Sequence, residues 1–170
     1  GFFMWGATAF EVAEYHIASD QLDRSLRDGS VVIDTAALTP RRTLTFTGEQ
    51  GEVPAPGLAG VYVYVAKATA GSAAGMTNQQ SQALVVTNLG LAVKRDDTRS
   101  IALAHQGERP AAGLRVTVVD TTNGQNRTLM SGTTGSNGLA SFTTPTAGSL
   151  TFVVRSGTSV AIQQTWDRTW

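Results

Sequence analysis

Short apolar and β-branched runs recur along the whole chain, and turn-forming residues separate them. Their spacing of roughly 8–15 residues is typical of an antiparallel β-sandwich. In one run, Leu114, Val116 and Val118 alternate with polar residues, as in a strand with one packed and one solvated face. The sequence therefore predicts an all-β fold. We expect strands at residues 10–16, 31–34, 43–47, 61–68, 83–86, 91–94, 101–105, 114–119, 128–131, 139–143, 150–155 and 160–163.

One segment, residues 19–29, departs from this pattern and predicts a short helix. Ser19 or Asp20 can cap its start, Leu22 and Leu26 stand four residues apart, and Gly29 can end it.

Two stretches rich in small polar residues are assigned to connections. Residues 70–82, AGSAAGMTNQQSQ, have no apolar period, which predicts a mobile loop. In residues 132–142, GTTGSNGLASF, the turn residues 135–138 predict a hairpin. A phosphate loop would need a following helix and a nearby lysine, and this stretch has neither.

Length and composition favour two modules and limit the classes of function. The 170 residues are 41% hydrophobic and 15% charged, enough apolar material for two small cores. We place a first β-sandwich at residues 1–87 and a second at residues 88–170. Thirteen basic and thirteen acidic residues cancel, so binding to nucleic acid is not expected. No apolar run approaches the roughly 20 residues that a membrane-spanning helix needs, so insertion into a membrane is not expected either.

The residue types do not predict catalysis, a metal or a cofactor. The chain has no cysteine and hence no thiol nucleophile or thiolate zinc site. No G-x-S-x-G elbow follows a strand. Glu14 and His16 share one strand face while Glu11 points to the other, so we interpret them as a solvated face rather than metal ligands.

A second group of charges surrounds a turn and is interpreted in the same way. Asp96 and Asp97 lie among Lys94, Arg95 and Arg99. Adjacent side chains on a strand diverge, and balanced charge at a turn is typical of a solvated hairpin loop.

Four motifs in a fixed order resemble consecutive macroglobulin domains of the bacterial α2-macroglobulin family. The motifs are GVYVYVAKA (60–68), ALVVTNLGLAVKRDD (83–97), ERPAAGLRVTVVD (108–120) and SGTTGSNGLASF (131–142). Asn88 and Ser136 stand where the family often has aspartate. The resemblance covers residues 60–154 well and the first 59 residues poorly. It implies two immunoglobulin-like or fibronectin-III-like β-sandwich domains.

The resemblance further implies a non-catalytic shell segment of a protease-trapping inhibitor. Such a protein is extracytoplasmic, usually periplasmic and often lipid-anchored, and it attaches to its protease through a thioester. That motif needs a cysteine, so any trapping chemistry must lie elsewhere in the full-length protein. The expected partners are neighbouring domains of a longer chain and, through the full-length protein, proteases. An immunoglobulin-like segment of a bacterial adhesin or surface protein, or an accessory sandwich of a carbohydrate-active enzyme, is the alternative.

Two groups of residues are candidates for contact and connection. The tight sequence Thr87, Asn88, Leu89 and Gly90 is expected to join the two modules, and Gly90 indicates a bulge or a close backbone approach. The aromatic residues offer either an interaction surface or, for the tyrosines, ordinary core packing. These residues are Tyr62, Tyr64, Trp166 and Trp170.

Overall fold

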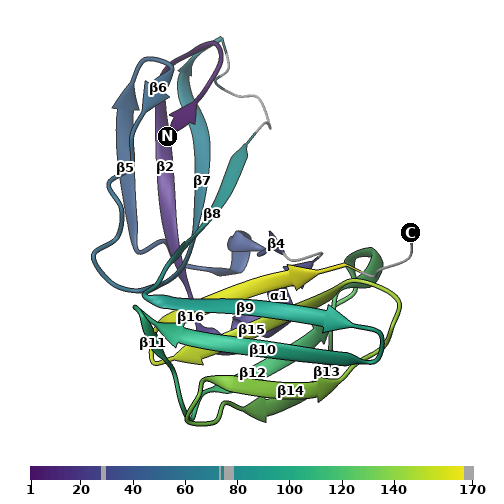
Figure 1. Cartoon of the computed structure of the whole chain (residues 1–170). Coiled ribbons are helices and arrows are strands. Elements are labelled where there is room, and N and C mark those ends of the chain that lie inside the picture. The colour runs from purple at the N-terminus through teal and green to yellow at the C-terminus, as the bar shows by residue number, and fades with distance from the viewer. Residues whose placement is uncertain (28–29, 73, 75–78, 167–170) are drawn as a thin grey trace. The chain divides into compact units, whose positions relative to one another are not determined.

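The computed structural model describes residues 1–27, 30–72, 74 and 79–166, and it is almost entirely β-structure (Figure 1). Every sheet pairing is antiparallel. The all-β fold class is therefore confirmed. Contacts divide the chain into two compact units. The first contains Gly1–Ile17 and Ile33–Leu84, and the second contains Ala18–Val32 and Val85–Trp170.

The first unit contains a four-stranded sheet in the order β5-β2-β7-β8 and a two-stranded ribbon of β1 and β6. Phe10 packs against Phe46 with ring centroids 5.0 Å apart, and the ribbon buries Phe2. The apolar side chains on one face of the long strands must be buried. A shift of one residue would turn them to the opposite face, so the pairing register is fixed. The elements are β1 (Phe2–Phe3), β2 (Ala7–Ile17), η1 (Thr35–Ala37), β5 (Arg42–Thr47), β6 (Gln50–Gly51), β7 (Gly60–Gly71) and β8 (Gln80–Val86).

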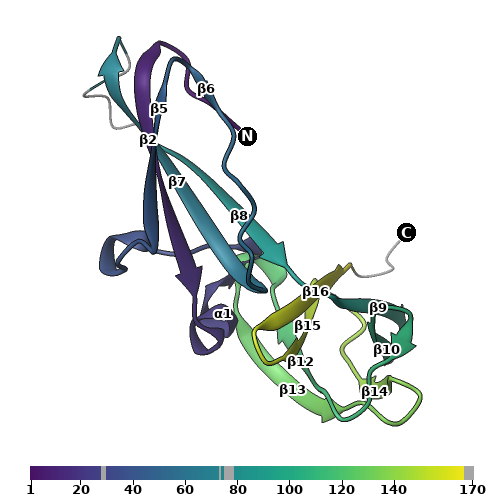
Figure 2. The same ribbon diagram turned by 90° about the vertical axis from the view of Figure 1, so that its left-hand side faces the viewer.

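The second unit is a sandwich of two sheets, which Figure 2 separates. One sheet has β10 between β9 and β14, with the short β11 at one end, and the other has the order β13-β12-β15-β16. The strands are β9 (Leu89–Asp96), β10 (Arg99–Gln106), β11 (Arg109–Pro110), β12 (Arg115–Asp120), β13 (Arg127–Thr133), β14 (Leu139–Thr143), β15 (Leu150–Ser156) and β16 (Ser159–Thr165), and η2 (Thr122–Gly124) follows β12.

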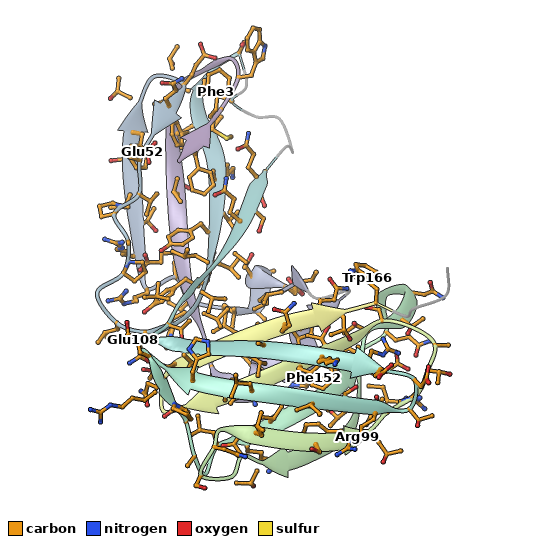
Figure 3. The ribbon with its side chains drawn as sticks, viewed as in Figure 1. Phe3, Glu52, Arg99, Glu108, Phe152 and Trp166 are labelled. Atoms are coloured by element: carbon orange, nitrogen blue, oxygen red, sulfur yellow. The ribbon has the colours of Figure 1, made fainter. Side chains whose placement is uncertain are left out.

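The core of the second unit lies between its two sheets. Phe152 of β15 is fully buried there and meets Phe142 of β14 edge to face, with ring centroids 6.0 Å apart (Figure 3). Val116, Val118 and Leu150 belong to the same cluster. The alternation that predicted the strand at residues 114–119 therefore identified the packed face of β12.

The segment Ala18–Val32 belongs to the second unit although it lies between β2 and β5 in the sequence. It contains α1 (Ser19–Ser25), β3 (Leu26–Arg27) and β4 (Ser30–Val31). The predicted helix is present but shorter than expected, since it ends at Ser25 and Leu26 begins β3. Its N-cap is Ala18, which makes no side-chain capping bond. Gly29 lies outside the described residues.

Both faces of β15 are buried. Val153 of β15 and Val119 of β12 point away from the core cluster, yet both are 0% exposed. In Figure 2 the segment lies on the side of this sheet opposite β9 and β10. Leu22 and Leu26 of the segment are also buried.

The stretch 132–142 turns the chain as predicted, but it does not form a hairpin. Gly138 N–H donates to Gly135 O at 2.9 Å, and Gly138 has a φ of +78°. The flanking strands β13 and β14 belong to different sheets, so the turn carries the chain from one layer to the other. The turn residues could not indicate this, because they do not show that β13 pairs with β12 and that β14 pairs with β10.

The predicted loop at 70–82 is shorter than expected. Strand β7 extends to Gly71 and β8 begins at Gln80, while residues 73 and 75–78 lie outside the described residues. Within the described part of the chain, no helix has the length and apolar character needed to cross a membrane.

Candidate functional site

The residues predicted to join the modules lie at the start of the second unit. Leu89 N–H donates to Thr87 Oγ1 at 3.0 Å, and Leu89 is 6% exposed within the core cluster. Asn88 accepts from Gly107 N–H at 3.2 Å through its carbonyl and from Ser159 Oγ at 3.2 Å through Oδ1. These bonds fix the course of the chain as it enters β9.

Gly90 makes a close contact with a side chain, not the bulge or close backbone approach that the sequence indicated. It lies directly opposite His105 in an uninterrupted β9–β10 ladder, so it is not a bulge. The imidazole of His105 occupies the space that a Cβ on residue 90 would need. His105 Nδ1 also lies 3.0 Å from Gly107 O, which holds the ring in this position.

Tyr62 and Tyr64 are packed inside the protein rather than on its surface, with exposures of 1% and 4%. Tyr62 Oη donates to Leu58 O at 2.9 Å, and Tyr64 Oη donates to Glu14 at 2.8 Å. The core-packing alternative therefore describes both tyrosines. Their spacing of two residues could not decide this, because a buried and an exposed strand face show the same alternation.

Glu14 is the centre of a buried polar cluster, and its assignment to a solvated face was wrong. The carboxylate is 2.9 Å from Arg41 and 2.9 Å from Arg42, and its side chain is 1% exposed. Glu14 follows Phe10 and Val12 on the buried face of β2, and only His16 beyond it reaches solvent. The arginines lie 27 and 28 residues further along the chain, which is why local sequence did not reveal the cluster.

The cluster shifts the titration of its members. Burial acts to raise the pKa of Glu14, but hydrogen bonds from Arg42 and Tyr64 and the charges of both arginines outweigh it, so the pKa is lowered. Burial and the hydrogen bond to Glu14 raise the pKa of Tyr64 to about 12. The carboxylate is therefore ionised and structural at neutral pH.

Arg95 was predicted to lie in a solvated turn, but its side chain is buried. It is 7% exposed and donates to the carbonyls of Pro145, Ala147 and Gly148 at 2.9, 3.0 and 2.6 Å. It thereby ties the end of β9 to the loop before β15. Its neighbour Asp97 is exposed, with a φ of +22°.

Two of the remaining candidates are aromatic. Trp166 is 65% exposed (Figure 3), and Trp170 lies outside the described residues. Trp5 is 82% exposed, and its ring lies 6.5 Å from that of Phe3. Among the described residues, no three potential ligand side chains come together in a way that could hold a metal ion.

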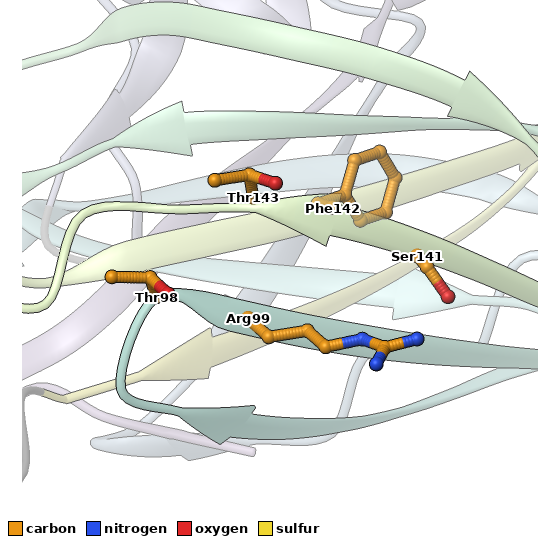
Figure 4. A pocket seen from close by; sticks show the side chains of 5 residues that line it. All are labelled: Thr98, Arg99, Ser141, Phe142 and Thr143. Carbon is orange, nitrogen blue, oxygen red and sulfur yellow. The ribbon is translucent and has the colours of Figure 1, made fainter.

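A surface hollow of about 420 Å³ lies beside β14 in the second unit (Figure 4). Its lining comes from the β9–β10 turn, the start of β10 and the end of β14. The lining residues are Thr98, Arg99, Ser141, Phe142 and Thr143. Sequence reasoning missed it, since only the β10–β14 pairing brings these residues together.

Comparison with solved structures supports the fold. The structure is similar to a fragment of Escherichia coli α2-macroglobulin spanning domains NIE-MG1, with a TM-score of 0.66 and 12% identity over 96% of this chain and 89% of that one. A longer fragment spanning MG0-NIE-MG1 gives a TM-score of 0.69 at 13% identity, over 95% of this chain and 55% of that one. The resemblance to macroglobulin domains is thus confirmed at the level of fold.

Other comparisons add little to this result. The chain spans about half of the longer macroglobulin fragment. The BSP domain of a biofilm associated protein matches with a TM-score of 0.33, at 13% identity over 96% of this chain and 26% of that one. No family model matches the chain, and no curated protein sequence is significantly similar to it.

Proposed function

We propose that this chain is a non-catalytic shell segment of a bacterial α2-macroglobulin-like protease-trapping inhibitor. The observation that carries the proposal is the similarity to the NIE-MG1 fragment over 96% of this chain, which includes both units. The first unit would correspond to NIE and the second to MG1. The order of the four sequence motifs supports the same conclusion independently.

The proposed role is mechanical. The chain would contact neighbouring domains of a longer polypeptide and would meet proteases only through the full-length protein. Thr87, Asn88, Leu89 and Gly90 would be the connection through which movement of one module reaches the next. Trp166 and Trp170 would contribute to contacts with adjacent domains. The domain boundary would lie at residues 87 and 88, and the full-length protein would be extracytoplasmic, periplasmic and lipid-anchored.

The test uses the full-length protein that contains this chain. We expect that protease treatment cleaves it once in a bait segment outside residues 1–170. The trapped protease should then lose activity on large protein substrates and keep activity on small peptide substrates. Intact mass before and after methylamine treatment should show a gain of one methylamine adduct at a thioester.

The two measurements separate the candidate functions. Protease protection without a methylamine adduct would retain the trap and remove the thioester. If the protease keeps full activity on large substrates and no adduct forms, the proposal is wrong. A segment of an adhesin or surface protein would then be the explanation to pursue, through binding to host glycans or receptors.

A further inference from the structure

Strand β14 forms one edge of its sheet. It pairs with β10 on one side, and no other strand in the described part of the chain pairs with it. Ala104 N–H donates to Gly138 O and Thr144 N–H donates to Thr98 O, each at 2.8 Å. Because hydrogen-bonded and non-bonded pairs alternate in an antiparallel ladder, Ala140 is also bonded to β10.

The same alternation directs the backbone groups of Ser141 and Thr143 away from β10. Leu139, which lies two residues before Ser141 and faces the same way, shows this directly. Its N–H donates to Asn137 Oδ1 at 3.1 Å, and its carbonyl accepts from Gly135 N–H at 3.0 Å. The turn thus satisfies the first outward residue, and Ser141 and Thr143 present two N–H groups and two carbonyls to solvent.

The hollow of about 420 Å³ lies beside these two residues. Arg99 lies across the ladder from Thr143, and its side chain extends along the sheet toward Ser141 (Figure 4). Arg99, Ser141 and Thr143 are exposed. Among the described residues, none holds the Arg99 guanidinium in an ion pair or hydrogen bond. An unpaired edge and an unpaired cation therefore meet at one hollow.

We propose that the β14 edge is a docking site for an extended peptide segment with an acidic side chain. The peptide backbone would pair with Ser141 and Thr143 as an added strand. Its carboxylate would bind Arg99, which offers a fork of donors suited to that group. This inference is independent of the proposed function, because it uses only contacts inside the second unit.

The experiment titrates the full chain with an acetylated and amidated pentapeptide of alternating valine and glutamate, followed by amide NMR. We expect saturable shifts centred on Ser141 and Thr143. The Arg99→Gln variant should weaken binding about tenfold, the loss typical of one charge-assisted hydrogen bond. Lys94→Gln is the matched control, because it removes an exposed cation from β9 and should leave the affinity unchanged.

Two altered peptides test the two contacts without changing the protein. Replacing glutamate by lysine should weaken binding by at least about tenfold, because it removes the Arg99 contact and brings two like charges together. Methylating the peptide nitrogens should abolish binding through loss of strand pairing. The proposal is overturned if the glutamate peptide binds no tighter than about 1 mM. It is equally overturned if the Arg99→Gln variant binds the glutamate peptide as tightly as the unchanged protein does, or if the methylated peptide binds as tightly as the unmethylated one. Amide shifts centred on residues other than Ser141 and Thr143 would also overturn it.

Discussion

The carboxylate of Glu14 is held by two arginines and a tyrosine, so its removal leaves those groups without their shared partner. We expect Glu14→Gln to lower the free energy of unfolding of the first unit by about 2 kcal/mol. Breaking a fully buried pair costs about 3–5 kcal/mol. The loss here should be smaller, because the arginine side chains are 43% and 34% exposed and remain partly solvated.

Urea unfolding measures this change, and Glu11→Gln is the matched control. Glu11 lies on the same strand but points to the opposite face, where it is only partly buried. Its substitution should change the free energy of unfolding by less than about 0.5 kcal/mol. Equal effects of the two substitutions would show that the Glu14 cluster contributes no specific stability.

Gly90 and His105 allow a second prediction about single residues. Gly90→Ala should destabilise the second unit by about 1–3 kcal/mol, because the added Cβ meets the imidazole. Gly57→Ala is the control, since no atom lies within 4 Å of a Cβ built there. Thermal unfolding of Gly90→Ala, His105→Ala and the double variant measures the coupling. The contact has no role if His105→Ala does not recover the stability lost in Gly90→Ala.

These two sites mark the limit of what local sequence could predict about residues. Gly90 interrupts an apolar strand, so the sequence indicated a bulge or a close backbone approach, but the group that approaches is the side chain of His105. Glu14 and Arg95 carry no comparable signal. A charged residue in an alternating strand is normally assigned to the solvated face, so the sequence does not show that its side chain is buried. Their partners lie 27 to 53 residues away, and only the tertiary fold brings them together.

The segment of α1, β3 and β4 carries the prediction about secondary-structure elements. A helix of seven residues without a side-chain cap has little stability of its own, so its structure depends on packing through Leu22 and Leu26. We expect Leu22→Ala to destabilise the second unit by about 2–5 kcal/mol, through loss of buried apolar contact and the cavity left behind. Hydrogen exchange should show reduced protection in β12 and β15.

The matched control is Leu58→Ala, because Leu58 is 65% exposed. It should leave the exchange of both units within the error of the measurement. Reduced protection in β2 and β7, with β12 and β15 unchanged, would contradict the assignment of α1 to the second unit. The result thus tests whether α1 packs in the second unit although it lies between two strands of the first unit in the sequence.

Strand positions followed from the sequence more closely than strand partners did. Alternation located β12 and β14, because one face of each must be apolar. A short continuous apolar run located β15, which is buried on both faces. The turn at 135–138 also follows from its residues. Turn residues, however, fix only the local direction of the chain, so the assignment of β13 and β14 to different sheets depended on pairing with β12 and β10.

Across the whole molecule, the two units should respond differently to pH. Glu14 in the first unit and Asp120 in the second both have a lowered pKa. For each carboxyl, the added stability is complete above its unfolded pKa near 4 and is lost as the pH falls through the folded value. Tyr64 has a raised pKa of about 12. Its contribution is complete below the unfolded value near 10 and is lost as the pH rises toward 12.

We therefore expect the free energy of unfolding of both units to fall in acid, and that of the first unit alone to fall between about pH 10 and 12 through this group. Urea unfolding followed at the methyl groups of Val12 and Val118, which are buried in separate units, measures each response. Tyr64→Phe removes the titrating hydroxyl and should flatten the alkaline decrease. An unchanged decrease in that variant would show that the loss of stability in alkali has another source.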